Sequence, residues 1–563
     1  MKRHFESRAD GRQGSAPTSR ESAETSRQDG SLRGVRKPGA SETGWRHADR
    51  RSALQQTGGL RYSFGRTCAS AATLVLLLAF FALTPSAGAR GEAKLSGSAW
   101  EPSVVTIEVA LKQYDYYQPW TKQTQRLRKP GLVVSDHQIL TTADELFGNT
   151  LVRMQKGGRG RWWTGQVTWL DYHANLAVLT VTNAAFWSDL KPATFGSGMP
   201  ADGGLQILRW NEGKLENRKV EFTQFVVREG QLSAVDQVVI EAGSDMQGAG
   251  WGEPLVADSH VVGLVRAQDG RTLLATPASC ILPVLDACKR QNYRGLGYFH
   301  FYWEPAENPA SLAELKLPGD PRGVIVTQVP SRPDRCDEVL RPKDILLQIE
   351  GFDLDIQGDY NDPEFGHLML ENLATRHKWA GDDVKMKIWR EGKALDITYR
   401  LPKFEYTNSL VPHAAYDQEP EYLIVGGLVF QPLIDPYLQN WGADWKRRAP
   451  FRLRYYDEQP PTGDRPALVL LSQVLPDPFN IGYQDQRYLV LDKVNGQSIS
   501  RLSDLRAALE KPADGFHIIE FMRSDSLRRM VIAAGEDEAS ATARVLKRYG
   551  IAEASHFAGA AAK

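Results

Sequence analysis

The sequence predicts a mainly β protein, in which an all-β region is followed by two α+β units. Short apolar runs rich in β-branched and aromatic residues dominate residues 102–292. In the second half of the chain, one order of strands, helix and hairpin occurs twice. The 563 residues also include 14 Trp and 19 Tyr, whose rings pack well on pleated sheets. A chain of this length has room for about three domains.

The N-terminal 89 residues predict a leader rather than a folded domain. Residues 1–66 are basic and poor in large apolar side chains, so we expect disorder. Residues 67–89 predict a signal peptide, because the apolar run 71–83 follows two arginines and precedes Ala87-Gly88-Ala89, a small-residue cleavage pattern. The run is shorter than the ~20 residues of a membrane span. We therefore expect export to the periplasm or secretion with a start near Arg90, and a membrane anchor through 71–83 is the alternative.

Residues 102–292 predict β-barrels closed by one helix. The short strand-like runs are separated by Gly, Asp and Asn clusters, as in all-β barrels. The runs lie at 103–111, 131–135, 150–155, 163–171, 176–182, 204–210, 237–242 and 260–267. The helix is expected over 279–291, where Ile281, Leu282, Leu285 and Cys288 form one apolar face.

Two units of similar element order are expected at 293–403 and 420–545. In the first unit, strands at 295–303, 323–329 and 344–354 precede a helical stretch near 364–376 and a hairpin at 383–401. In the second, strands at 422–433, 467–474 and 488–499 precede a helix at 501–511 and a hairpin at 516–534. Residues 546–563 predict a flexible tail.

Charge and cysteine content argue against several functions. The formal net charge is zero, whereas nucleic-acid binding requires a basic excess, so we expect no nucleic-acid partner. The four cysteines form no CxxC pair and no Cys/His cluster, so we expect neither a metal site nor a cofactor.

Several segments together resemble one family of proteases. They are QPWTKQTQR (118–126), ILTTAD (139–144), NLAVLTVTNAAFW (175–187), ATPASCILPVL (275–285), KWAGDDVKMKIWR (378–390), YLIVGGLVF (422–430) and SQVLPDPFNIGY (472–483). From about residue 103 to 545 the chain resembles the Deg/HtrA family of secreted and organellar serine proteases, above all its plant-type branch. The resemblance implies a trypsin-like double β-barrel at 102–292, followed by PDZ domain 1 at 293–403 and PDZ-like domain 2 at 420–545.

The sequence departs from this family at each of the three catalytic positions. Asp144 stands where the family has the general-base His, Asn175 replaces the orienting Asp, and Trp251 replaces the nucleophilic Ser. A carboxylate with an ordinary pKa of about 4 is a weak base at neutral pH, an amide cannot stabilise an imidazolium, and indole is not a nucleophile. Ala249 and Glu253 also replace glycines beside Trp251, where positive φ would be costly. We therefore predict a pseudoprotease without catalytic residues.

Two other interpretations stay open at this point. A relocated catalytic set could draw on His137, Asp171, His173 and Ser244, or Asp144 and Glu253 could act as a carboxylate pair. Such a protein would be an active serine-type endopeptidase with an unrecognised catalytic set. The chain could also be a purely structural oligomeric scaffold.

The resemblance further implies peptides or unfolded proteins as partners. PDZ domains add an extended peptide to a sheet edge, and a backbone loop receives its carboxylate. Gly295, Leu296, Gly297, Tyr298 and Phe299 match that loop in the first unit, and residues 425–430 lie at the equivalent place in the second. A role in envelope protein quality control or scaffolding follows. We also expect a trimer-based homo-oligomer, from the resemblance and from the aromatic segment YDYYQPW (114–120).

Overall fold

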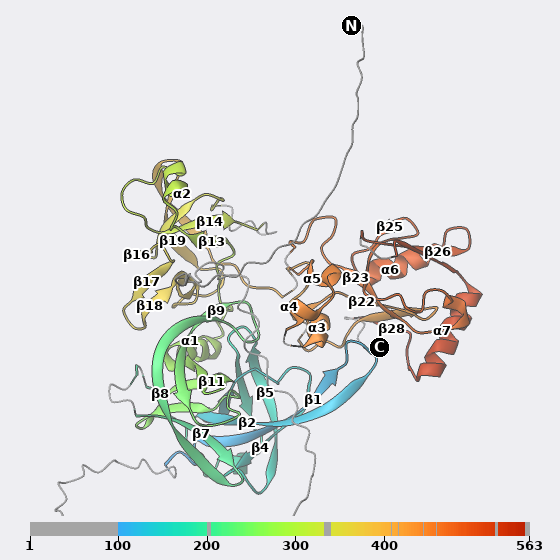
Figure 1. Ribbon diagram of the computed structural model, residues 1–563. Coiled ribbons are helices and arrows are strands. Elements are labelled where there is room, and N and C mark those ends of the chain that lie inside the picture. Colours follow the sequence, from blue (N-terminus) through green and yellow to red (C-terminus); the bar gives the residue numbers. More distant parts are fainter. Residues whose placement is uncertain are drawn as a thin grey trace, which may run out of the picture. The chain divides into compact units, whose positions relative to one another are not determined.

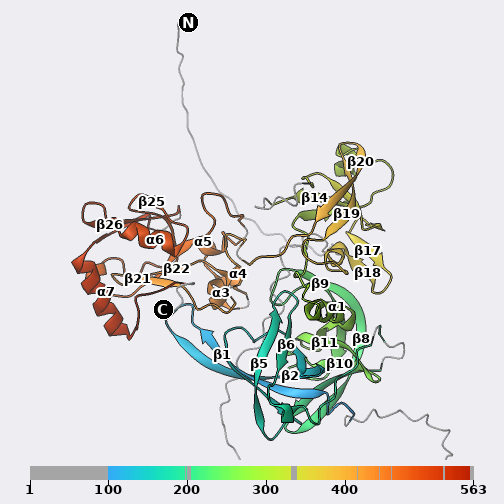
Figure 2. The same ribbon diagram turned by 180° about the vertical axis from the view of Figure 1, so that it is seen from behind.

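The computed structural model of the chain describes residues 99–557, apart from 197, 200–203, 331–338, 407, 415, 443, 458 and 524–526 (Figures 1 and 2). The expected disordered segment 1–66, the signal peptide 67–89 and the apolar run 71–83 lie outside the described residues. Within the described part of the chain, no helix is both long enough and apolar enough to cross a membrane.

The first six strands form a closed barrel, with neighbours in the order β1-β2-β3-β6-β5-β4. They are β1 (Val104–Tyr114), β2 (Lys122–Ser135), β3 (Gln138–Thr141), β4 (Asn149–Lys156), β5 (Trp162–Asp171) and β6 (Leu176–Thr180), followed by η3 (Ala184–Phe186). Fully buried Ile107, Met154 and Leu179 belong to its core. β2 passes close to its neighbours at Gly131, where a Cβ atom would lie 2.6 Å from Ile139 Cγ2, so only glycine fits.

The second barrel is also closed, in the order β10-β11-β12-β9-β8-β7. Its elements are β7 (Leu205–Asn211), β8 (Lys214–Glu229), β9 (Asp236–Ser244), β10 (Pro254–Ala257), β11 (His260–Asp269), β12 (Thr272–Pro277) and α1 (Ala278–Lys289). The predicted double barrel and its terminal helix are therefore confirmed. The 16-residue strand β8 was not expected from the sequence. It contains many charged residues and few buried ones, so it lacks the apolar pattern of a strand.

The first α+β unit contains a sheet in the order β13-β14-β15-β19-β20, to which β16 pairs through β15. Its elements are β13 (Tyr302–Pro305), α2 (Pro309–Glu314), β14 (Val324–Gln328), β15 (Ile345–Ile349), β16 (Phe352–Asp353), β17 (Asp359–Asp362), β18 (Gly366–Met369), η4 (Leu370–Ala374), β19 (Asp383–Arg390) and β20 (Lys393–Arg400). The helix expected near 364–376 was wrong for its first half. Asp362 Oδ1 accepts the N–H groups of Glu364 and Phe365, which makes a tight turn and starts β18 instead.

The second α+β unit has a sheet in the order β27-β26-β24-β23-β22-β21-β28. Its elements are β21 (Tyr422–Val425), β22 (Leu428–Pro432), α3 (Asp435–Leu438), η5 (Gln439–Trp441), α4 (Trp445–Arg448), α5 (Phe451–Arg454), β23 (Val469–Val474), η6 (Pro478–Asn480), β24 (Leu489–Val494), β25 (Gln497–Ser498), α6 (Leu502–Leu509), β26 (Phe516–Phe521), β27 (Arg529–Ala533), α7 (Glu536–Tyr549) and β28 (Ser555–His556). The helix expected over 501–511 corresponds to α6.

The end of the chain differs from the flexible tail expected over 546–563. Helix α7 runs to Tyr549 and is capped by Gly550, whose φ of 66° places it in the left-handed region. Ile551 is buried, and β28 pairs with β21 so that His556 lies opposite Tyr422. Residues 546–557 thus complete the second unit, and residues 558–563 lie outside the described chain.

The tip of the β1–β2 hairpin contacts the second α+β unit. The Tyr117 ring lies 5.7 Å from the ring of Trp441, and the Trp120 ring lies 6.0 Å from that of Tyr422. Gln431 Nε2 donates to the backbone oxygen of Tyr116. The aromatic segment on which the trimer expectation rested therefore has partners within its own chain, and the oligomeric state stays a prediction.

Candidate functional site

The three positions that correspond to a catalytic triad lie next to one another. Asp144 follows β3 and Asn175 precedes β6, and the Asp144 N–H donates to Asn175 Oδ1 at 3.0 Å. Asn175 has a φ of 50°, a conformation that asparagine tolerates better than most residues. The loop that carries Trp251 lies against β3, because a Cβ atom at Gly252 would be 2.8 Å from Thr141 Oγ1. The fold thus brings together the three residues that the sequence singled out.

Asp144 is buried, and no imidazole is among the partners of its carboxylate in the described chain. Gln231 Nε2 donates to Asp144 Oδ2 at 2.9 Å. The buried Lys129 ammonium donates to the backbone oxygens of Asp144 and Thr142, at 2.6 and 2.8 Å. Burial raises the pKa of Asp144, against the opposing charge of Lys129. Burial also lowers the pKa of Lys129 to about 8. These contacts fix the loop after β3 in place.

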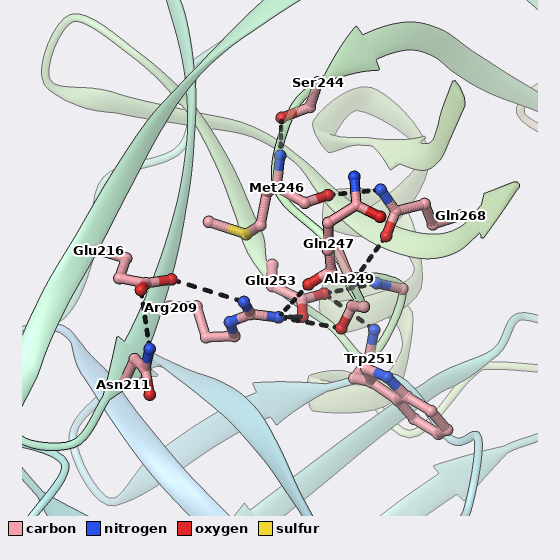
Figure 3. Close-up of polar contacts among 12 residues, drawn as sticks. Arg209, Asn211, Glu216, Ser244, Met246, Gln247, Ala249, Trp251, Glu253 and Gln268 are labelled. Carbon is pink, nitrogen blue, oxygen red and sulfur yellow. Dashed lines mark hydrogen bonds and ion pairs between the residues drawn. The ribbon is translucent and has the colours of Figure 1, made fainter. Parts of the chain in front are cut away.

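The loop at Trp251 binds its own backbone donors (Figure 3). Glu253 Oε2 accepts the N–H groups of Gly250 and Trp251 at 2.9 and 2.8 Å. The Ala249 N–H donates to Gln268 Oε1 at 2.8 Å. An oxyanion hole needs such N–H groups free to face a developing negative charge. In this chain, side-chain oxygens already occupy them.

Glu253 is fully buried beneath this loop, and burial raises its pKa. Arg209 Nη1 lies 4.0 Å from Glu253 Oε1, while the same guanidinium donates to the Gly248 oxygen. The positive φ expected at Ala249 and Glu253 was wrong. The left-handed residues of the loop are Gly250 and Gly252, so the two substitutions cause no backbone strain of that kind.

The alternative of a relocated catalytic set drawn from His137, Asp171, His173 and Ser244 does not assemble among the described residues. Ser244 Oγ accepts the Met246 N–H, and the His137 ring packs on Trp187. Asp171 Oδ1 accepts the Ala174 N–H. The carboxylates of Asp144 and Glu253 each bind other groups, as described above.

One hydroxyl–imidazole pair exists that the sequence did not predict. His173 Nδ1 lies 2.8 Å from Ser233 Oγ, and burial lowers the pKa of His173. Ser233 is 60 residues away along the chain and lies in no motif, so only the fold could place it there. Ser233 Oγ also accepts the Val235 N–H, and its side chain is buried.

A segment between the two α+β units covers this face of the barrels. We call residues 404–417 the strap, of which 407 and 415 are not described. Tyr406 stacks on His173 with ring centroids 4.5 Å apart, and Tyr416 stacks on Tyr172 at 4.2 Å. The hydroxyls of Tyr406 and Tyr416 both donate to the Leu232 oxygen, at 2.9 and 3.0 Å. Asp417 Oδ1 accepts the Gly148 N–H at 2.7 Å. The strap therefore closes over His173, the neighbour of the Asn175 position.

The predicted carboxylate loop of the first α+β unit packs largely inward. Leu296 is 7% exposed and belongs to a cluster that includes Ile281 and Val284 of α1. Gly295 has a φ of 90°, Gly297 forms a bridge with Lys403, Tyr298 contacts the Phe404 ring and Phe299 contacts the Tyr399 ring. The cavity beside Leu296 measures about 60 Å³. The strand that follows this loop, β13, is an outer strand of its sheet, so its edge can receive another strand.

The equivalent loop of the second unit, residues 425–430, is a hairpin turn filled by the chain itself. The Gly426 N–H donates to Thr542 Oγ1 of α7, and Asn480 Nδ2 donates to the Gly426 oxygen. Gly427 has a φ of 91°, and a Cβ atom there would lie 2.5 Å from Asn480 Nδ2. β28 also pairs with β21, so this strand is not an outer strand of its sheet.

Two groups of carboxylate and imidazole side chains have ligand atoms within 4.8 Å of one another. They are Asp355, Asp359 and His367, and His413, Asp435 and Asp457. In the first group, His367 lies 3.5 Å from Asp355. In the second, His413 lies 3.2 Å from Asp435 and Lys446 lies 3.8 Å from Asp457. These acid–base contacts explain the clustering, so we assign no metal to either group.

Two closed barrels followed by two units with PDZ-type element order define a trypsin-like barrel protein with PDZ units. Comparison with known proteins agrees. The PDZ domain family model matches residues 411–556. Protease Do-like 2, chloroplastic, of Arabidopsis thaliana is 25% identical over 476 residues, which cover 82% of this chain and 75% of that protein. Protease Do-like 4, mitochondrial, of the same plant is 24% identical over 427 residues, which cover 72% and 76%.

Among solved structures, the HtrA-type protease AlgW with decapeptide shares 16% identity, covers 55% of this chain and 99% of that chain, and has a TM-score of 0.41. The predicted relationship of this chain to the Deg/HtrA family, with a PDZ domain at its C-terminal end, is confirmed by the matched PDZ domain and by the similarity to the Do-like proteases.

Proposed function

We propose that this protein is a Deg/HtrA-like pseudoprotease that binds peptides or unfolded protein segments. The observation that carries the proposal is the Glu253 carboxylate, which takes up the N–H groups of Gly250 and Trp251. At the same site, Trp251 offers no nucleophile and Asp144 binds an amide instead of an imidazole. Loss of one triad residue leaves some catalysis from the oxyanion hole. Here the hole is also occupied, so no peptidase activity should remain.

Peptide binding would use β13, which is an outer strand of its sheet among the described residues. An added peptide strand forms main-chain hydrogen bonds, and these supply affinity whatever the amino-acid sequence of the peptide. Leu296 is buried against α1, so the loop that would receive a terminal carboxylate packs inward, which favours extended, unfolded segments over one specific C-terminus. A unit that binds in this way suits protein quality control or scaffolding.

The compartment and assembly state are part of the same proposal. The relatives are named as chloroplastic and mitochondrial proteins, and residues 67–89 predict export. We infer an exported or organellar protein, periplasmic or secreted in a bacterial cell, that forms trimer-based homo-oligomers. A start near Arg90 in protein isolated from its host would support this, and an intact residue 1 in the soluble cytosol would contradict it.

One observation favours the enzymatic alternative, namely the contact of 2.8 Å between His173 and Ser233. Three features oppose it. Ser233 is buried, Tyr406 covers the imidazole, and among the described residues no carboxylate oxygen is hydrogen-bonded to the His173 ring. The pair is best explained as a structural contact beneath the strap.

A serine-directed fluorophosphonate probe and an unfolded casein substrate distinguish these functions. We expect no labelling and no cleavage, and we expect the single change Trp251→Ser to restore neither. The triple change Asp144→His, Asn175→Asp and Trp251→Ser should recover at most a trace, because Glu253 still occupies the hole. Stoichiometric labelling that disappears in Ser233→Ala would establish the enzymatic alternative instead.

Hydrogen exchange tests the binding half of the proposal. Addition of a permanently unfolded protein should protect the amides of residues 302–305 in β13. The other outer strand of the same sheet, β20, serves as the internal control and should not change. Absence of protection at β13 would leave a structural scaffold as the function.

A further inference from the structure

A run of twelve residues in the second α+β unit concentrates positive charge and aromatic rings. Residues 445–456 read WKRRAPFRLRYY, with five Lys or Arg and no Asp or Glu. The whole chain has no net charge, so this concentration is local. The run forms the short helices α4 and α5, which lie between β22 and β23.

Apolar side chains at every fourth position fix the run to the unit. Trp445, Ala449 and Leu453 are buried and belong to a cluster that includes Tyr437 and Leu468. With these three residues turned inward, Arg447, Arg448, Phe451 and Tyr455 are exposed. The position of the charged face is therefore set by the packing of the unit and not by the charges themselves.

The outward face combines exposed arginine side chains with exposed aromatic rings. Phe451 is 66% exposed and Tyr455 is 49% exposed, and their rings lie 5.9 Å apart. The Arg454 guanidinium lies over the Phe451 ring at 5.4 Å. Within the described part of the chain, Arg447 and Arg448 are exposed and have no carboxylate at ion-pair distance. We call Arg447, Arg448, Phe451, Arg454 and Tyr455 the basic–aromatic patch.

We propose that the basic–aromatic patch docks the protein on the surface of an anionic phospholipid bilayer. Cations near such a surface are attracted by its negative potential. Exposed Phe and Tyr rings enter the boundary between headgroups and acyl chains, where an apolar ring leaves water and the Tyr hydroxyl stays hydrated. We commit to lipid rather than nucleic acid because the chain as a whole has no basic excess, the electrostatic feature by which nucleic-acid-binding proteins are recognised. Membrane docking through this patch does not depend on the peptide-binding function proposed above.

Vesicle sedimentation with the full chain tests this proposal. The probes are vesicles of neutral phosphatidylcholine and vesicles with roughly one-third phosphatidylglycerol, whose surface is anionic. The unmodified chain should bind the anionic vesicles more tightly, and high salt should weaken that binding. The double change Arg447→Gln and Arg448→Gln should lower the partition coefficient about twenty-five-fold, at about fivefold for each cation. Phe451→Ser should lower it further at high salt.

Lys214→Gln with Lys219→Gln is the matched control, because it removes two exposed charges from β8 and leaves the patch intact. Its binding should stay within twofold of the unmodified chain. The apolar run 71–83 is present in every variant, so differences between variants report on the patch alone. All altered side chains are exposed, and equal melting temperatures verify folding.

Equal binding by the patch variant and the control would overturn the proposal. Binding to single-stranded RNA in place of vesicles, lost in the patch variant, would assign the patch to nucleic acid.

Discussion

The Glu253 carboxylate holds the loop at Trp251 by accepting two of its backbone N–H groups, so replacing Glu253 should lower the free energy of unfolding. Glu253→Ala removes the acceptor for one buried and one partly buried N–H group, at about 1–3 kcal/mol each. We expect the free energy of unfolding to fall by about 2–6 kcal/mol in urea titrations. Glu253→Gln keeps an oxygen acceptor and should cost about 1 kcal/mol. Equal losses in the two variants would show that burial volume, and not the hydrogen bonds, is what matters.

Lys129 should make stability depend on pH in the alkaline range. Burial lowers its pKa to about 8 in the folded chain, whereas a lysine in water has an ordinary pKa of 10.5, so between these pH values the unfolded chain binds the extra proton. Stability therefore rises with pH across this window, by about 3 kcal/mol for this group. The difference in unfolding free energy between the unmodified chain and Lys129→Met should increase in favour of the unmodified chain from pH 8 to 10.5. A constant difference would contradict the lowered pKa of Lys129 in the folded chain.

The sequence motifs indicated where the candidate site lies, but they did not indicate which side chains surround it. The fold brings together Asp144, Asn175 and the loop of Trp251, which the resemblance singled out from motif order. Gln231, Ser233 and the strap tyrosines also surround this site. They reach the site from distant parts of the sequence, and no local pattern signals a contact of that kind.

Among the elements, the strap packs on the barrels through the aromatic stacks of Tyr406 and Tyr416 and through hydrogen bonds of tyrosine hydroxyl groups. Tyr416 contributes one of each, with the Tyr172 ring and the Leu232 oxygen. Tyr416→Phe loses only the hydrogen bond and should cost about 1 kcal/mol of unfolding free energy. Tyr416→Ala also loses the ring contacts and should cost about 3 kcal/mol. Urea unfolding of both variants measures the difference, and equal values would show that the ring stack contributes nothing.

The elements that sequence patterns missed share a physical cause. Strand β8 is stabilised by pairing with β7 and β9 on both sides, so its charged residues do not need an apolar pattern of their own. The helix expected near 364–376 gave way to a hairpin because Asp362 caps a turn that a periodicity count does not detect. Helix α6, with buried Leu502, Leu505 and Ala508, follows the helical period and was predicted correctly.

At the scale of the whole molecule, the β1–β2 hairpin and Glu419 join the first barrel to the second PDZ unit. Besides the aromatic contacts at the hairpin tip, Lys112 Nζ lies 2.7 Å from Glu419 Oε1. An exposed ion pair of this kind contributes little, so the aromatic contacts of Tyr117 and Trp120 should carry most of the docking energy.

Removal of those two rings should separate the unfolding of the unit from that of the barrels. We expect the double variant Tyr117→Ala and Trp120→Ala to show two thermal transitions where the unmodified chain shows one, because docked units unfold together only while their interface stabilises both. The second PDZ unit should melt first in the variant, since it loses the ring contacts to Trp441 and Tyr422. Tyr302→Ala removes an exposed ring from β13 and should leave a single transition. A double variant that still unfolds in one step, at the temperature of the unmodified chain, would show that the hairpin tip does not couple the two parts.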